Sequence, residues 1–311
     1  MTEAAGRPVQ AATTGSAAFG PGAGIGKPHA PPPDPLPAPA FDSHCHLDMI
    51  DLPVAEVLDQ ARAAGITRVV TVGCDVPSAR WAADCAAAFD EVYAAVAIHP
   101  NETALAGRGI AAGGDAGRAG RGIAAGGDAA LAEIARLAAL PQVRAVGETG
   151  LDYYRDSAPP QVQRDWFRAH IDIAKQVRKP LMIHDRAAHE DVLAILAADG
   201  APEQVIFHCF SGDAELAARC AAAGYVLSFA GTVTFQNAAD LRAAAAAVPA
   251  ELILAETDAP FLTPVPNRGK ANAPAQVAST VRAIAAVRQL DVAKLCAVIE
   301  ATGKRLFWGQ G

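Results

Sequence analysis

The sequence is poor in aromatic residues and carries no excess of positive charge. Aromatic side chains make up 5% of the 311 residues, whereas hydrophobic residues as a class make up 51%. A sizeable core is therefore available, and we expect slender, alanine-rich helices around it. The net charge of −7 argues against bulk electrostatic attraction to nucleic acid or to anionic membranes. It does not exclude a nuclease, because bound metal ions can supply positive potential locally.

Three further absences concern cysteine pairs, long apolar runs and a signal peptide. None of the six cysteines forms a C-x-x-C pair, which argues against a zinc ribbon or a thioredoxin-like motif. No uninterrupted apolar run of about 18 residues occurs, so we expect no membrane span. The N-terminus lacks the basic and then apolar layout of a signal peptide. Together these features predict a cytoplasmic protein with reduced thiols.

Two segments have a composition that is typical of chain without regular structure. Residues 1–38 are rich in Ala, Gly and Pro and show no apolar periodicity, so we predict a disordered N-terminal arm. The unit AGRGIAAGGDA occupies 106–116 and recurs identically at 119–129. This repeat is too short and too rich in glycine to bury a face. We therefore predict a low-complexity loop insert over 105–129, since surface loops tolerate such insertions.

The rest of the chain, 39–311, alternates short β-branched runs with longer stretches of helical period. The predicted strands cover 39–43, 68–73, 92–98, 143–147, 180–184, 204–208, 225–229 and 252–257. Eight strands that alternate with helices predict a single-domain α/β fold, a (β/α)8 TIM-type barrel. A doubly wound open sheet is the alternative, but the sequence lacks the Gly-rich first turn often found in that fold.

Metal-capable side chains stand at the ends of five predicted strands. They are His44, His46, Glu148, His184, His208 and Asp258. In a barrel of this class, catalytic residues come from the C-terminal ends of several strands. Taken singly, each residue is explained as well by a structural histidine or by a carboxylate that caps a turn. Because the same event recurs at five strand ends, chance is a poor explanation, and the pattern predicts a metal centre.

The spacing of these residues indicates how they would share two ions. His44 and His46 are two positions apart, so an extended strand points both side chains to one face. We assign His44, His46 and Asp258 to one ion, His184 and His208 to a second, and Glu148 to a bridging position. These ligands suit divalent Mg, Mn or Zn, and they leave positions open for water and substrate. We name Asp258 and Glu148 as catalytic, with Asp258 taking a proton from the attacking water.

Other polar residues near the strand ends are candidates for substrate binding. His99 ends the third predicted strand and could contact a substrate anion, donate a proton or fix the turn that follows it. Arg155 and Arg186, and further along Arg268 and Lys270, could meet phosphates, although solvated surface explains each equally well. From this group we name His99, Arg155 and Arg186 as substrate-binding residues.

These blocks resemble the TatD family of metal-dependent deoxyribonucleases. The matching segments are FDSHCHLD at 41–48, HP at 99–100, GETGLDYY at 147–154, KPLMIHDR at 179–186, FHCFSG at 207–212, ETDAPFL at 256–262 and RGKANAP at 268–274. The resemblance covers about 40–308 and implies a TIM-type barrel that holds one or two divalent ions on the six residues named above. It also implies hydrolysis of phosphodiester bonds, with the best-known members removing nucleotides from single-stranded DNA. The N-terminal arm and the repeated insert depart from the family pattern.

Three hypotheses about function follow. The first is a monomeric, metal-dependent deoxyribonuclease that cleaves single-stranded DNA in an exonuclease-like manner. The second is an amidohydrolase-type enzyme acting on a small-molecule amide or ester, although position 148 lacks the lysine of the carboxylated-lysine subtype. The third is a non-catalytic barrel that only binds metal, and its weakness is that the six predicted ligands are intact.

Overall fold

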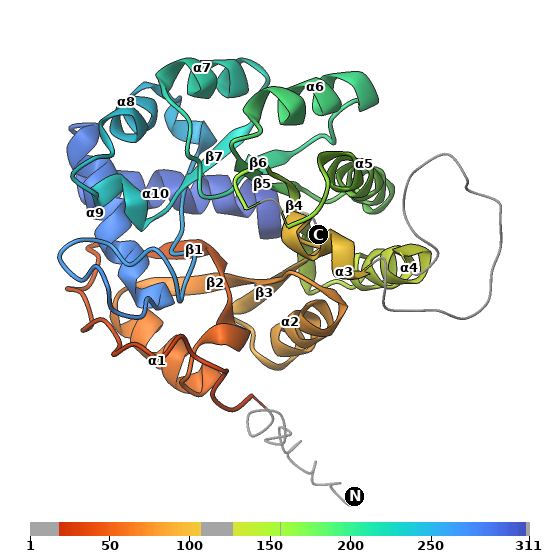
Figure 1. The fold of residues 1–311 in the computed structure, drawn as a ribbon. Coiled ribbons are helices and arrows are strands. Elements are labelled where there is room, and N and C mark those ends of the chain that lie inside the picture. Colours follow the sequence, from red (N-terminus) through yellow and green to blue (C-terminus); the bar gives the residue numbers. More distant parts are fainter. Residues whose placement is uncertain (1–18, 107–126, 156, 309–311) are drawn as a thin grey trace, which may run out of the picture.

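Eight parallel strands and ten α-helices make up the part of the chain that the computed structural model describes, residues 19–106, 127–155 and 157–308. The strands are β1 (Ala40–Cys45), β2 (Ile66–Gly73), β3 (Val92–Val96), β4 (Val143–Asp152), β5 (Leu181–Arg186), β6 (Val205–Phe207), β7 (Val226–Phe229) and β8 (Ile253–Ala255). The α-helices are α1 (Val54–Ala63), α2 (Val76–Ala88), α3 (Thr103–Ala106), α4 (Gly127–Ala138), α5 (Pro160–Val177), α6 (His189–Asp199), α7 (Ala214–Ala222), α8 (Ala239–Ala247), α9 (Val277–Val287) and α10 (Val292–Gly303). Each strand pairs with the next along the chain, and the helices surround the strands (Figure 1).

The sheet closes where the chain leaves its first and last strands. Cys45 and Ala259 form a parallel bridge beyond the end of β8. The Asp258 N–H donates to the carbonyl oxygen of His44 at 3.0 Å, and the His46 N–H donates to that of Ala259 at 2.8 Å. The prediction of a (β/α)8 TIM-type barrel is confirmed, because strictly sequential neighbours exclude the strand order of a doubly wound sheet.

The strands owe their composition to burial on both faces. Every residue of β1 and β7 is buried, and β4 has a single half-buried position among ten. Helices cover the outer face and side chains fill the interior, so near-continuous runs of Val, Ile, Leu and Ala are expected. The same cover lets polar residues occur in strands only where a partner satisfies them.

Three strands extend beyond the carboxyl ends that the sequence predicts, and the first of them, β1, runs to Cys45 rather than to 43. β4 runs to Asp152 rather than to 147, and β5 runs to Arg186 rather than to 184. The extended parts of β4 and β5 pair with each other, since Thr149 faces Ile183 and the pairing continues to the ends of both strands. Glu148 therefore lies within a strand, and backbone pairing overrides the polar character of the segment.

Gly150 makes this extension possible. Its φ of 140° lies in the region that favours glycine, and a Cβ at this position would collide with the carbonyl oxygen of His184. Without a side chain, β4 approaches β5 closely, which brings Glu148 beside His184.

The N-terminal segment differs from the predicted disordered arm, 1–38, where the structure describes it. Residues 19–38 lie against the barrel, and the Phe19 ring packs edge-on against Trp81 and Phe89. The N–H of Ala30 donates to the carbonyl oxygen of Ala271 at 2.9 Å, which ties the segment to the loop after β8. Average composition does not reveal a half-buried aromatic ring or specific backbone hydrogen bonds. Residues 1–18, and 107–126 of the predicted insert 105–129, lie outside the described residues.

No described helix has both the length and the apolar character needed to cross a bilayer.

A buried histidine on α5 supports the end of β3. The Nε2 atom of His170 accepts a hydrogen bond from the Ile98 N–H at 3.0 Å, and its Nδ1 lies 2.7 Å from the carbonyl oxygen of Trp166. This pattern requires the neutral ring with its proton on Nδ1. Burial lowers the pKa of His170 to about 4, so the ring stays neutral at physiological pH.

We predict that His170 makes the protein less stable as pH falls. Its pKa is lower in the folded chain than the ordinary 6.5, so the unfolded chain binds the proton first and stability declines from about pH 6.5 to about pH 4. The slope is at most about 1.4 kcal/mol per pH unit. Urea unfolding at several pH values should show wild type losing its advantage over His170→Met as pH falls. A constant difference between the two proteins across that range would contradict this role.

Candidate metal centre

The structure brings the six predicted metal-capable side chains together at the carboxyl ends of the strands. They come from five strands: His44 lies in β1 and His46 directly after it, Glu148 lies within β4 and His184 within β5, His208 directly follows β6, and Asp258 lies three residues after β8. Four are buried, and the side chains of His184 and Asp258 are 18% and 16% exposed. Among them, His44, His46 and Asp258 place their ligand atoms close enough to share one metal ion, and further groups combine the predicted residues with Glu256, Cys74 or His99.

The first ligand group gathers around one oxygen of Glu148. The Nε2 atoms of His44 and His46 lie 3.3 Å apart, and Asp258 Oδ1 lies 3.6 and 3.4 Å from them. Glu148 Oε1 lies 3.7 and 3.5 Å from the same two nitrogens. Tetrahedral ligands at about 2.1 Å from a metal are separated by about 3.4 Å. The spacing of the two imidazoles therefore suits a divalent ion shared with Asp258 Oδ1, and likewise one shared with Glu148 Oε1.

The second ligand group gathers around the other oxygen of Glu148. Its Oε2 lies 2.6 Å from His208 Nε2 and 3.2 Å from His184 Nδ1. The two imidazole nitrogens are 3.3 Å apart. Three protein ligands leave coordination positions for water or substrate, as catalytic metal sites require. Glu148 thus offers one oxygen to each group.

The carboxylates of this centre carry the charge that a cation needs. Burial raises the pKa of Glu148 and of Asp258, but the surrounding imidazoles more than reverse this effect and hold both groups below their usual values. Both side chains are therefore anionic at neutral pH. Anionic oxygens combined with imidazole nitrogens form a donor set that suits Zn or Mn.

Side chains that the sequence analysis did not single out hold the ligands in place. Glu256 is fully buried, and its Oε1 lies 3.2 Å from His208 Nδ1 while it accepts from the Cys209 N–H at 2.8 Å. Asp152 Oδ2 lies 3.3 Å from His184 Nε2. Such contacts fix the orientation of a ligand imidazole. A signal was present, because Glu256 stands two residues before Asp258 at the same strand end.

Cys74 also belongs to the centre and was missed. Its thiol donates to Glu148 Oε1 at 3.4 Å and lies 3.9 Å from His46 Nδ1. Cys74 directly follows β2, the same position that His208 holds after β6.

Of the predicted substrate-binding residues, His99 reaches the centre. Its Nε2 lies 3.8 Å from Glu148 Oε2, and its Nδ1 accepts from the Asn101 N–H at 3.0 Å. Burial lowers the pKa of His99 to about 3, so the ring is neutral and carries its proton on Nε2. His99 therefore fixes the turn after β3 and also presents an N–H toward the ligand groups.

The two arginines lie further out. The Arg186 guanidinium is half-buried and stands 4.1 Å from the centre of the Tyr154 ring. Arg155 is exposed, and its backbone N–H donates to Asp152 Oδ1 at 2.9 Å. Arg186 is the last residue of β5 and Arg155 lies three residues after β4, and both strands carry ligands. The structure gives neither guanidinium a contact with the six ligand side chains.

Backbone strain is concentrated beside the centre. Asp258 has a φ of 54° and Cys209 a φ of 44°, values that non-glycine residues rarely adopt. Such residues cluster at functional sites, where the surrounding structure holds them. Asp258 is held by its own N–H bond to His44, and Cys209 by its N–H bond to Glu256.

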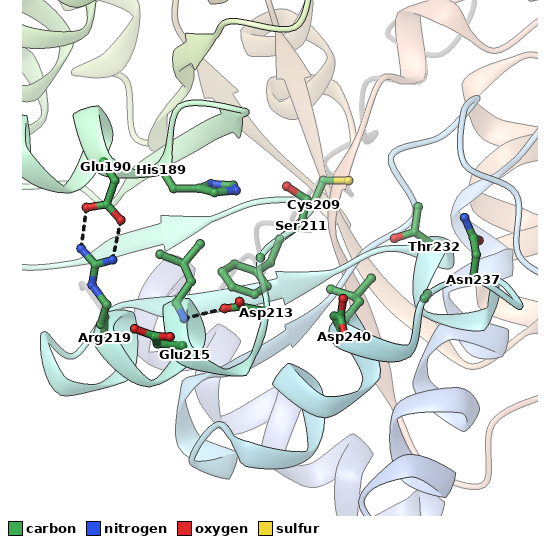
Figure 2. Close-up of a pocket in the computed structure, with 15 residues that line it drawn as sticks. His189, Glu190, Cys209, Ser211, Asp213, Glu215, Arg219, Thr232, Asn237 and Asp240 are labelled. Atoms are coloured by element: carbon green, nitrogen blue, oxygen red, sulfur yellow. Dashed lines mark hydrogen bonds and ion pairs between the residues drawn. The ribbon is translucent and has the colours of Figure 1, made fainter.

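A cavity of about 600 Å³ lies next to the centre, and Cys209, which follows the predicted ligand His208, is one of its lining residues. Figure 2 shows its wall of polar side chains, among them Glu190, Glu215 and Asp240. Among the described residues that line it, Arg219 is the one Lys or Arg, and it is paired with Glu190 at 2.5 Å. The lining is acidic overall, which disfavours a phosphate chain.

Comparison with known proteins places the chain in a family. Residues 41–308 match the family model described as TatD related DNase. The chain belongs to the TatD family. Its relatives include an "uncharacterized metal-dependent hydrolase TatD" from Mycobacterium tuberculosis, 47% identical, with 78% of this chain and 88% of the relative covered. Another is "uncharacterized metal-dependent hydrolase YabD" from Bacillus subtilis, 37% identical, with 86% and 98% covered.

Solved structures agree with this placement. YJJV, a TatD homologue from Escherichia coli K12, superposes with a TM-score of 0.73 at 25% identity and covers 86% of this chain and 97% of its own. A hydrolase TatD family protein from Entamoeba histolytica shares the fold, with a TM-score of 0.71 at 16% identity, and 87% of this chain and 99% of that one covered. This TatD chain is therefore a metal-dependent hydrolase, and its ligand groups are consistent with divalent ions.

We predict that Glu256→Gln weakens metal binding without unfolding the barrel. The amide can still accept from His208 Nδ1 but loses the charge that makes this imidazole a stronger ligand, so affinity should fall about 10- to 100-fold. Calorimetric titration with Mn²⁺ measures the effect, and Glu203→Gln on the exposed surface is the matched control. Equal affinity in both variants would show that Glu256 does not support the centre.

Proposed function

We propose that this protein is a deoxyribonuclease that hydrolyses phosphodiester bonds of single-stranded DNA, removing nucleotides in an exonuclease-like manner. The observation that carries the proposal is the position of Glu148, with one carboxylate oxygen in each of two ligand groups. Two ions held by these groups, with Glu148 contributing to both, would supply the charge stabilisation that in-line displacement at phosphorus needs. Membership of the TatD family, whose model is described as a DNase, supports it.

In this proposal the protein binds two divalent ions of the Mg, Mn or Zn type. The first is held by His44, His46 and Asp258, the second by His184 and His208, and Glu148 contacts both. When bound, the ions lower the pKa of a water molecule and neutralise charge on the phosphate oxygens. Asp258 accepts the proton of the attacking water, which its anionic state permits.

Three further residues act on the substrate in this proposal. His99 donates its Nε2–H to a phosphate oxygen, while Arg186 and Arg155 contact neighbouring phosphates at the barrel mouth. The groups that hold both ions come from one chain, which supports a monomer. The cysteines are free in the structure, which supports a reducing compartment such as the cytoplasm.

A second candidate is a small-molecule hydrolase acting on an amide or ester. The observation that favours it is the acidic cavity of about 600 Å³ that begins at Cys209 (Figure 2). A cavity of this size accommodates a small ligand, and its carboxylates would prefer a cationic or hydrogen-bond-donating group.

The test is a cleavage assay on the purified protein loaded with Mg²⁺, Mn²⁺ or Zn²⁺. Labelled single-stranded DNA, bis(p-nitrophenyl) phosphate and a panel of amides and esters are compared, with Asp258→Asn as the isosteric control. We expect DNA cleavage that falls at least about 100-fold in the variant, the typical size of a lost acid–base contribution. Intact DNA with wild type, or equal cleavage by both proteins, would refute the proposal. Hydrolysis of an amide or ester alone would establish the second candidate.

A further inference from the structure

The described part of the N-terminal segment forms one wall of a second pocket, of about 300 Å³. Its other walls come from the loop after β8 and from Phe235, which follows β7. The lining residues are Ile25, Lys27, Phe235, Pro260, Phe261, Leu262, Thr263, Arg268, Gly269 and Lys270. The match to the TatD family model begins at residue 41, so Ile25 and Lys27 come from outside it.

The segment that carries Lys27 is anchored on both sides of the loop residue Ala271. The Ala30 N–H donates to the carbonyl oxygen of Ala271 at 2.9 Å, and the Ala271 N–H donates to that of Pro28 at 2.8 Å. His29 lies between Pro28 and Ala30, and its Nε2 atom is 2.5 Å from Asp51 Oδ1. Lys27 therefore directly precedes a fixed stretch of backbone and lines the pocket together with the residues of this loop.

The charge of this pocket is opposite to that of the protein. It is lined by Lys27, Arg268 and Lys270, and none of the described residues that line it is acidic. The chain as a whole carries a net charge of −7, and the charged side chains that line the cavity at Cys209 are mainly carboxylates. The second pocket therefore suits an anion better than the cavity at Cys209 does, and its three cationic side chains suit a phosphate.

Two aromatic rings line the same pocket and connect it to the metal centre. The Arg268 guanidinium lies 4.0 Å from the centre of the Phe235 ring. Phe261 is 43% exposed, and its ring centre lies 6.4 Å from that of His46, a member of the first ligand group. Exposed rings beside cations are the combination that binds the bases and phosphates of a single strand.

We propose that this pocket binds a nucleotide of the single-stranded DNA substrate next to the bond that is cleaved, with Lys27 contacting its phosphate. The inference rests on the proposed function, since it identifies where the strand lies beside the metal centre. Lys27 is a substrate-binding residue supplied by the N-terminal segment, and it takes no part in metal binding.

The experiment compares Lys27→Ala with Lys304→Ala. Lys304 is also exposed, but it follows α10 at the opposite end of the barrel. Its neighbour Arg305 shows this position, because the Arg305 guanidinium donates to the carbonyl oxygen of Glu251, just before β8. For a labelled single-stranded oligonucleotide we expect Lys27→Ala to raise KM up to about fivefold, as for an exposed ionic contact. The slope of log KM against log salt concentration should fall by about 0.7, the value for one phosphate contact in a single strand. Lys27→Arg should restore both values, and Lys304→Ala should match wild type.

A small phosphodiester separates this inference from the proposed function. Bis(p-nitrophenyl) phosphate has no neighbouring nucleotide, so Lys27→Ala should leave its kcat and KM unchanged. If the wild type cleaves DNA but Lys27→Ala has the same KM and salt slope as Lys304→Ala, the pocket assignment is wrong and the proposed function still stands. Equal losses on DNA and on the small diester would also overturn it. Wild type inactive on both substrates would overturn the proposed function.

Discussion

The centre depends on one buried carboxylate, that of Glu148. It is 3% exposed and is surrounded by imidazoles from β1, β3, β5 and β6. An anion in such a place is costly unless positive charge compensates it. Although burial opposes protonation of His208, Glu148 and Glu256 raise the pKa of this imidazole well above its usual value. Protons on the imidazoles can thus compensate the negative charge of Glu148. Divalent cations that displace those protons would compensate the same charge.

The barrel supplies what this carboxylate requires. Strictly sequential parallel strands bring their carboxyl ends into one ring, so residues far apart in the sequence meet there. Gly150 allows β4 to lie against β5, and the strand then carries Glu148 to the middle of the ring. Carboxylates behind the histidines, Glu256 and Asp152, hold the rings so that the opposite nitrogens face the ligand groups.

Much of the fold and the convergence of the ligand side chains could be predicted from the sequence, because both follow from local patterns. Short buried runs identify strands, and a period of two places His44 and His46 on one face. Glu256 could not be assigned a role, because its importance lies in a hydrogen bond to His208, 48 residues away. Asp152 was concealed by the extension of β4, which only pairing with β5 reveals.

The N-terminal segment shows the limit of composition. Its Gly, Pro and Ala content predicts disorder, yet Phe19 packs between Trp81 and Phe89, and backbone bonds to Ala271 hold the stretch that follows Lys27. Average composition does not register one aromatic ring or the position of one lysine. These particulars give this chain a basic pocket whose N-terminal wall lies outside the match to the family model.

Anomalous diffraction from crystals soaked in Mn²⁺ tests the central claim most directly. We expect two manganese peaks in the anomalous difference map, one on each side of the Glu148 carboxylate. The first should be bound by Oε1 with His44, His46 and Asp258, and the second by Oε2 with His184 and His208. A single peak, or two peaks of which neither contacts Glu148, would contradict it.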